Sequence, residues 1–567
     1  MVMLLTRTEK VLSALLLAGT FITSIFISPS VSLEPIDQPK LLILVVTGFA
    51  ALGLLLSNWK KVFGLTSPAL KIILGLFTLQ LLNVLIYDRS PFVQQFYGAS
   101  GRNTGFLCYL ALGILLFGSA AISSSKNLGK FTWLLITAGA LSIPYDLLQT
   151  FNHDPIKWNN QYNSILGFLG NPDFESSFVG MVGVSLVALV LAKKFTLAQR
   201  FSVSALVLLC IFVILRSHAQ QGMIVFLAGS AIVGLLFLRG SETFGKRWIV
   251  GSYSAICAFA FMIITLGAFK IGPLTRIIYK ESVTRRGFYW HAAIKMMNNH
   301  PINGIGLDSY GDWYLQYRSK AAFLADATKQ SNAAHNVFLD FGANGGWPLF
   351  ILNLALFVLA GYAVIRYLRR EKKYGWHYAA ILGAWVAYVS QAIISINQIG
   401  LVVWGWVFTG LLIGHEFKTR QTEASPAPQN KDLNNGGRGR RVRGKGVNQI
   451  ELPIAFVGLL IGILIMVPYF RADANFRKAT QIQKASAIVD AAYASPRDEN
   501  RMLQAAQLFL SSKMPDQALE ILHELVKSNP RNYNAWVLLS QAETPNSPGY
   551  IKARAMMQAQ NPLQPLK

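Results

Sequence analysis

The stretch KLLILVVTGFAALGLLLS, residues 40–57, contains a single charged side chain, that of Lys40. A helix needs roughly 20 predominantly apolar residues to cross the hydrocarbon core of a bilayer. An amphipathic helix on the surface of a soluble protein would instead carry its apolar residues in a stripe. The continuous apolar run therefore predicts a transmembrane helix.

The same pattern recurs along most of the chain. Of its 567 residues 53% are hydrophobic and only 14% are charged, and the apolar residues fall in runs of about 17 to 22. We therefore predict an all-α polytopic membrane protein with about 13 transmembrane helices. The predicted spans are 11–28, 40–57, 68–87, 105–122, 131–150, 174–192, 201–216, 222–238, 248–269, 336–365, 377–396, 399–417 and 450–469. The first span could pass for a signal peptide, but the spans that follow favour an uncleaved helix.

The distribution of basic residues predicts the orientation of these spans. Lys and Arg are retained on the cytoplasmic side of short connections. With the N-terminus inside, every second connection should be basic, and each one is, so the net charge of +25 is largely a topology signal. The connections expected outside are about 88–104, 151–173, a large loop at 270–335, and the segment after residue 469.

A basic linker at 418–449 contains NNGGRGRRVRGKG, residues 434–446. Arginine and glycine repeats of this kind occur in nucleic-acid-binding segments, which also use aromatic residues for base stacking. Because no aromatic residue is interleaved here, we favour a cytoplasmic linker that contacts anionic lipid headgroups, and we expect no nucleic-acid partner.

The character of the sequence changes after the last predicted span, 450–469. Residues 514–543, MPDQALEILHELVKSNPRNYNAWVLLSQAE, predict an antiparallel helix pair broken at Pro530, and residues 501–513 supply a preceding helix. This pattern resembles a tetratricopeptide repeat, with a generic helical hairpin as the alternative. We expect residues 470–567 to form an extracytoplasmic docking or shielding module that could bind a protein partner.

The large loop and the span after it carry an ordered series of short motifs. They lie in VTRRGFYWHAAIKMMNNHPINGIGLDSYGDWY, residues 283–314, and AAHNVFLDFGANGGWPLF, residues 333–350. An arginine precedes a tryptophan by four residues, a proline and a Gly-x-Gly turn follow, and a His-Asn pair opens a helix with glycines. The residues concerned are Arg286, Trp290, Pro301, Gly304, Gly306, His335 and Asn336. This order resembles the O-antigen ligase and polymerase superfamily of membrane enzymes.

Further matching pieces extend the resemblance over residues 1 to about 417. YGASGRNTGFL, residues 97–107, resembles the family's early external loop through Arg102, and FLGNPDFESSFVGM, residues 168–181, resembles its Gly-Asn-Pro helix start. The family usually has Ser-Arg-Gly at the outer end of its seventh span. Here Gln221 stands where the arginine is expected, and Arg216 supplies a charge from one turn earlier.

The resemblance implies a reaction and roles for these residues. Such enzymes transfer a glycan from a polyprenyl diphosphate to an acceptor hydroxyl at the outer face of the bacterial cytoplasmic membrane, with inversion. Arg286 is then expected to bind the diphosphate, and His335 to act as the general base. Residues expected to assist are Arg102, Arg216 and Arg285 at the diphosphate, with Asn336, Trp290 and Gln221 in support. The reaction needs no cofactor or metal ion, and no DxD, His-x-x-x-His or Cys-x-x-Cys pattern occurs.

Each of these residues also has a simpler interpretation. His335 could only cap its helix or anchor it at the headgroups, and Arg285 or Arg286 could bind lipid headgroups. Gly304 and Gly306 fit a turn better than a phosphate cradle.

Three functions remain open at the level of sequence. The first is glycan transfer from the lipid-linked donor to another glycan, to a lipid, or to protein as an O-oligosaccharyltransferase. The second is a lipid-linked glycan transporter or flippase, which should show related halves with broken helices. The third is a scaffold that anchors the C-terminal module. The external loop and the number of spans favour the first.

Overall fold

The computed structural model describes residues 7–87, 89–158, 165–193, 195–424 and 451–565. Within these ranges every regular element is a helix, which confirms the predicted all-α class. The Arg/Gly-rich stretch at 434–446 lies outside the described residues, so the prediction for the linker stays a prediction.

Twelve of the described helices are long and apolar enough to cross a membrane, and Phe106–Ile122 is a shorter apolar helix beside them. Each predicted span overlaps one of these helices, so the polytopic architecture is confirmed. Their bounds are α1 Arg7–Ile25, α2 Asp37–Ser57, α4 Pro68–Ile86, α6 Phe106–Ile122, α7 Ser125–Thr150, α8 Pro172–Val190, α9 Leu197–Arg216, α10 Gln220–Arg239, α11 Arg247–Ala268, α16 Val337–Arg370, α17 Trp376–Ile394, α18 Ile399–Ala424 and α19 Glu451–Ile482.

Helix α18 forms the centre of the bundle. It packs against α6, α16 and α17, and its indole rings Trp404 and Trp406 are fully buried. Helix α11 is more apolar than α18, yet of its residues Gly267 alone is buried in the protein. An apolar side chain costs nothing when it faces lipid tails, so this contrast fits a helix at the lipid-facing edge of the bundle.

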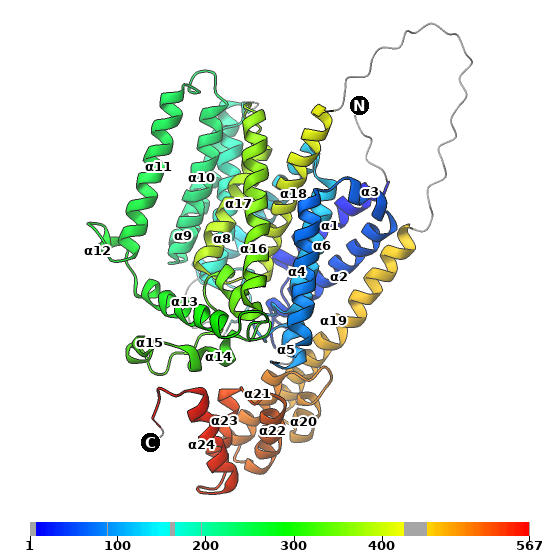
Figure 1. Cartoon of the computed structure of the whole chain (residues 1–567), viewed down its shortest axis with the longest axis vertical. Helices are drawn as coiled ribbons and strands as arrows, with labels where there is room; N and C mark the ends of the chain where they lie inside the picture. The colour runs from blue at the N-terminus through cyan, green and yellow to red at the C-terminus, as the bar shows by residue number, and fades with distance from the viewer. Residues whose placement is uncertain (1–6, 88, 159–164, 194, 425–450, 566–567) are drawn as a thin grey trace.

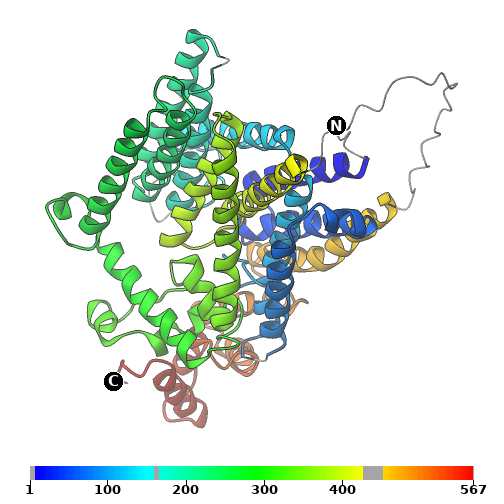
Figure 2. The same ribbon diagram turned by 45° about the horizontal axis from the view of Figure 1, so that its top comes forward.

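The shorter helices gather mainly at one end of the bundle (Figures 1 and 2). The green helices α13–α15 lie there beside the red and orange helices of the C-terminal module, and α5 lies close by. Their bounds are α5 Phe92–Tyr97, α12 Thr275–Ile278, α13 Glu281–Asn299, α14 Tyr310–Tyr317 and α15 Lys320–Ala325, while α3 is Trp59–Gly64. The large loop and the module therefore share one end of the molecule.

The C-terminal module consists of α20 Ala485–Ala492, α21 Glu499–Ser511, α22 Pro515–Ser528, α23 Tyr533–Ala542 and α24 Pro548–Gln560. The predicted helix pair corresponds to α22 and α23, which break around Pro530 and bury Ala518, Leu522, Leu525 and Trp536. Helix α19 continues to Ile482, past the expected boundary at residue 470, because no proline or glycine interrupts it after Pro468. The resemblance to tetratricopeptide repeats stays a prediction.

A kink in α16 joins the large loop to the membrane helices. Gly346 has φ +72°, and a Cβ atom built on it would lie 2.5 Å from the Pro301 carbonyl oxygen. The Trp347 amide donates to that oxygen (2.8 Å), and the Ile305 amide donates to the Ala343 carbonyl oxygen (3.0 Å). The turn after α13 is therefore fastened to the start of α16 by backbone hydrogen bonds.

Gly304 and Gly306 form that turn, with φ of +61° and +104°. Their amides donate to the carbonyl oxygens of His300 (3.0 Å) and Asn344 (3.1 Å). Both N–H groups are thus used inside the protein, which favours the turn interpretation over a phosphate cradle.

Candidate active site

Helix α13 presents Arg286, Tyr289 and Trp290 on one face, because residues three and four apart are neighbours on a helix. The Trp290 Nε1 donates to the carbonyl oxygen of His335 at 3.4 Å. This contact fixes α13 against the loop that leads into α16. The four-residue spacing seen in the sequence therefore places Arg286 one turn from the anchoring indole, on the face that meets His335.

His335 lies just before α16, partly buried, with its ring centre 5.2 Å from that of Tyr289. Its φ of +51° is in the left-handed region, which costs a non-glycine residue roughly 1 kcal/mol or more. The cap of α16 comes from Asn336, whose Oδ1 accepts from the Leu339 amide (3.0 Å). Asn336 Nδ2 also donates to the Ile393 carbonyl oxygen (2.9 Å). His335 is therefore not the capping residue, and its ring is left available for chemistry.

The electrostatics keep His335 uncharged. Burial, followed by the positive charges of Arg286 and Arg102, lowers the pKa of His335 to about 3. A neutral imidazole can accept a proton, whereas the imidazolium cannot. The contribution of Arg286 to this lowered pKa indicates that its charge lies close to the His335 ring.

Arg286 has unused hydrogen-bonding capacity. Its Nη1 lies 3.4 Å from the Ser282 hydroxyl, and its Nε is buried without a partner among the described residues. Burial lowers the pKa of Arg286, and the charge of Asp173 at the start of α8 opposes that effect. An anion that reached this guanidinium would meet donors that are already partly stripped of water.

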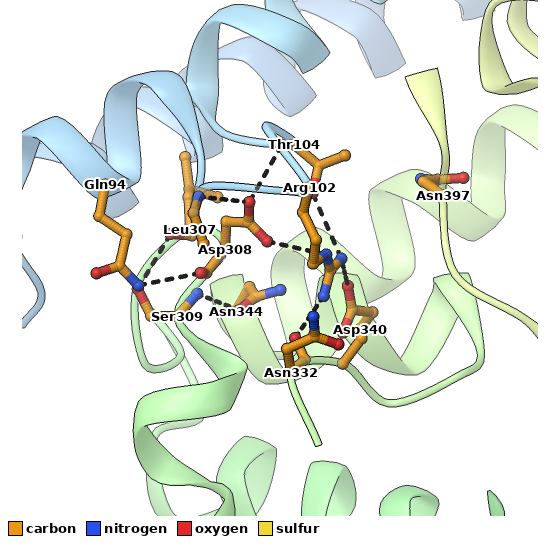
Figure 3. A network of polar contacts seen from close by, with 12 residues as sticks. Gln94, Arg102, Thr104, Leu307, Asp308, Ser309, Asn332, Asp340, Asn344 and Asn397 are labelled. Atoms are coloured by element: carbon orange, nitrogen blue, oxygen red, sulfur yellow. Dashed lines mark hydrogen bonds and ion pairs between the residues drawn. The ribbon is translucent and has the colours of Figure 1, made fainter. Parts of the chain in front are cut away.

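Arg102 is held between two carboxylates (Figure 3). Its Nε lies 3.3 Å from Asp308 Oδ1 and its Nη2 lies 2.9 Å from Asp340 Oδ2, with all three side chains largely buried. Burial lowers the pKa of Arg102, but these carboxylates raise it above its ordinary value. Arg102 Nη1 donates to the Asn332 carbonyl oxygen, and the Ala334 amide donates to Asp340 Oδ1 (3.0 Å). This ion-pair network therefore shapes the loop immediately before His335.

Residues 205–354 match the family model described as O-antigen ligase. This match supports the resemblance to the O-antigen ligase and polymerase superfamily over that segment. No curated protein matches the chain. The matched segment contains α13, His335 and the kink of α16, whereas Arg102 and the C-terminal module lie outside it. The family indicates a membrane glycosyltransferase of the ligase or polymerase type.

Two other predicted residues in the matched segment have partners outside the candidate site. Arg285 pairs with Glu281 (2.9 Å) and with Asp326 (3.4 Å). Gln221 is buried and its Nε2 donates to the Ser177 hydroxyl on α8 (3.1 Å), so it joins α10 to α8 where the family has an arginine. Arg216 is exposed at the end of α9 and makes no hydrogen bond or ion pair with any described residue. The roles predicted for Arg102, Arg216, Arg285 and Gln221 stay predictions.

The structure adds residues that sequence reasoning missed. Tyr289 faces His335, Asp173 acts on Arg286, and Asp308 and Asp340 hold Arg102. Two signals were present: Asp173 directly follows Gly-Asn-Pro, and Asp340 follows Asn336 by one helical turn. Neither reveals a partner, because the pairing residues lie far apart in the chain. Among the described residues, no three His, Cys, Asp or Glu side chains are grouped as a metal site would require.

Proposed function

We propose that this protein transfers a glycan, with inversion, from a polyprenyl diphosphate to an acceptor hydroxyl at the outer face of the bacterial cytoplasmic membrane. One observation carries the proposal: the Trp290 indole on α13 donates to the backbone carbonyl oxygen of His335. This contact keeps Arg286, one turn earlier on α13, close enough to His335 for its charge to lower the pKa of the imidazole. The orientation rests on the alternation of basic connections along the sequence.

Arg286 is assigned to the diphosphate of the donor. A guanidinium is planar and keeps its charge when partly desolvated, and its N–H groups match phosphate oxygens. The leaving group gains negative charge as the glycosidic bond breaks, so a fixed cation stabilises the transition state more than the ground state. We assign this stabilisation to Arg286 and not to a metal ion.

His335 is assigned to the acceptor hydroxyl. A base whose pKa is about 3 is weak, so the free enzyme holds His335 in an unreactive state. A bound diphosphate would neutralise Arg286 and add negative charge beside the imidazole. Both effects raise the pKa of His335, so the base becomes stronger once the donor is present.

The reaction is then a single displacement. The acceptor oxygen attacks the anomeric carbon from the side opposite the diphosphate, and its proton passes to the His335 imidazole. The bond between the anomeric carbon and the diphosphate oxygen breaks, and the electron pair leaves with the diphosphate beside Arg286. The products are an inverted glycosidic bond and a polyprenyl diphosphate.

The test uses the purified full chain, reconstituted with a polyprenyl-diphosphate oligosaccharide and without added metal. We expect His335→Ala to lower the rate of polyprenyl-diphosphate release by about 10²–10⁴-fold, and Arg286→Ala by about 10²–10³-fold. His291→Ala and Arg276→Ala are matched controls, because these exposed residues lie on α13 and α12 away from the site. Passage of intact donor across the bilayer without bond cleavage would instead establish the transporter.

The acceptor divides the proposed function further. A ladder of lengthening lipid-linked chains identifies a polymerase, and a single glycan on a lipid core identifies a ligase. A glycan attached to a hydroxyl of a polypeptide identifies an O-oligosaccharyltransferase. The docked C-terminal module favours a polymerase or transfer to protein over a minimal lipid ligase.

A further inference from the structure

Helix α14 lies between the candidate active site and the C-terminal module. Tyr310 and Tyr314 lie four residues apart on one side of this helix, and Trp313 and Gln316 lie three residues apart on another side. We propose that the C-terminal module is a positioning element for His335, and that Arg531 is the residue through which it holds α14. This inference rests on the proposed function only where turnover is used to measure it.

Arg531, which precedes α23, contacts the side of α14 that carries Trp313 and Gln316. The guanidinium carbon of Arg531 lies 3.1 Å from the centre of the Trp313 ring, and its Nη1 donates to Gln316 Oε1 at 3.0 Å. Stacking on an indole together with a directed hydrogen bond fixes a planar cation more tightly than either contact alone. Arg531 therefore holds α14 in both position and rotation.

The side of α14 that carries Tyr310 and Tyr314 supports the residue that packs on His335. The Tyr310 hydroxyl donates to the carbonyl oxygen of Tyr289 (2.8 Å), and the Tyr314 ring meets the Tyr289 ring edge-on at 5.5 Å. Tyr289 in turn lies 5.2 Å from the His335 ring. Only α14 and one tyrosine thus separate Arg531 from the proposed base.

A second connection reaches the His335 loop through polar groups. Gln94 Nε2 donates to Asp312 Oδ2 (3.0 Å) and to the Asp308 carbonyl oxygen (3.1 Å), as Figure 3 shows in part. The Asp308 carboxylate pairs with Arg102, which holds the loop before His335. Displacement of α14 would therefore disturb the base from two directions.

Other contacts make the module a fixed neighbour of the membrane domain. Arg318 Nη2 at the end of α14 donates to Asn561 Oδ1 (2.8 Å), and Asn500 Nδ2 donates to the Ser100 hydroxyl (3.0 Å). Because a displacement of about 1 Å at a reacting group can cost about 10²-fold in rate, small shifts of α14 are expected to matter.

The test compares Arg531→Ala with Arg497→Ala in the full chain. Arg497 is a matched control, since it pairs with Glu524 inside the module (3.2 Å). We expect Arg531→Ala to lower kcat by about 3- to 30-fold, with a smaller change in the KM for the donor, while Arg497→Ala leaves both unchanged. Gln316→Leu removes only the hydrogen bond and is expected to show a smaller loss of the same kind.

Hydrogen exchange supplies a readout that does not need turnover. The Ala334 amide is bonded to Asp340, so its exchange reports the His335 loop directly. We expect faster exchange over residues 331–336 and α14 in Arg531→Ala but not in Arg497→Ala. Unchanged exchange and kcat in Arg531→Ala would overturn the positioning role and leave the proposed function intact. Faster exchange in a protein that transfers no glycan would overturn the proposed function alone.

Discussion

At the scale of single residues, the site depends on the electrostatic relation between Arg286 and His335. Burial, followed by the charge of the guanidinium, lowers the pKa of the imidazole, and in the proposed reaction a diphosphate bound at Arg286 opposes the second effect. Neither property follows from the His-Asn motif alone, because the lowered pKa depends on burial that only the folded chain provides. The sequence could suggest the two residues through family resemblance, but not their coupling.

The pH dependence of turnover tests this coupling. kcat/KM for the donor reports the free enzyme, where the pKa of His335 is about 3, whereas kcat reports the donor complex. Because His335 must be neutral to act, activity falls as pH drops through its pKa. We expect the acid limb of kcat at a higher pH than that of kcat/KM, in initial rates measured between about pH 4 and 8. Coinciding limbs would show that the donor does not act on His335.

At the scale of elements, apolar run length predicted each described helix that is long and apolar enough to cross a membrane, because the bilayer leaves few other ways to satisfy the backbone. The kink in α16 was not predicted, although Gly345 and Gly346 were visible in the sequence. Glycines in a membrane helix indicate close packing in general. Only the structure shows that the loop turn bonds to the backbone there. The four-residue spacing of Arg286 and Trp290 was informative because α13 is a regular helix.

Gly346→Ala tests the fastening of α16 to the large loop. The alanine would have to adopt φ +72°, which L side chains disfavour. Its Cβ would lie 2.5 Å from the Pro301 carbonyl oxygen. We expect a loss of about 1–3 kcal/mol in stability, together with reduced glycan transfer. Gly361→Ala is the matched control, since it lies in the same helix with open space around it. Thermal unfolding in detergent measures both, and equal stability of the two variants would argue against the fastening.

Docking of the C-terminal module should weaken as pH rises. Burial, followed by the neighbouring charge of Asp312, raises the pKa of Glu499 on α21 from 4.5 to about 8. Burial also raises the pKa of Asp312 to about 6. A raised folded-state pKa contributes stability that is present below the unfolded value and is lost as pH rises through the folded value.

Glu499→Gln should remove the part of this pH dependence that comes from Glu499, because the amide cannot ionise. We expect the protease resistance of the wild-type module to fall between about pH 5 and 8. Glu499→Gln lacks one titrating group, so its protease resistance should fall less over the same range. Glu520→Gln, on the neighbouring helix α22, is the control and should retain the wild-type profile. A variant that follows the wild-type profile would assign the pH response to other groups.

At the scale of the whole molecule, the chain joins a bundle of membrane helices to a helical module through the large loop. The sequence predicted both parts and their common side, through hydropathy and basic residues. It could not predict that the module packs on α14, because the contact between Arg531 and Trp313 joins segments far apart in the chain. The contacts of the module with α14 support its proposed positioning role.

The central claim is that Arg286 and His335 act on one donor as a unit. The most direct measurement is the rate at which His335→Ala, Arg286→Ala and the double variant release polyprenyl diphosphate from a polyprenyl-diphosphate oligosaccharide. Groups that act together lose activity non-additively, so the double variant should be little slower than the slower single variant. Losses that multiply in the double variant, or a single variant with wild-type release, would contradict the shared site.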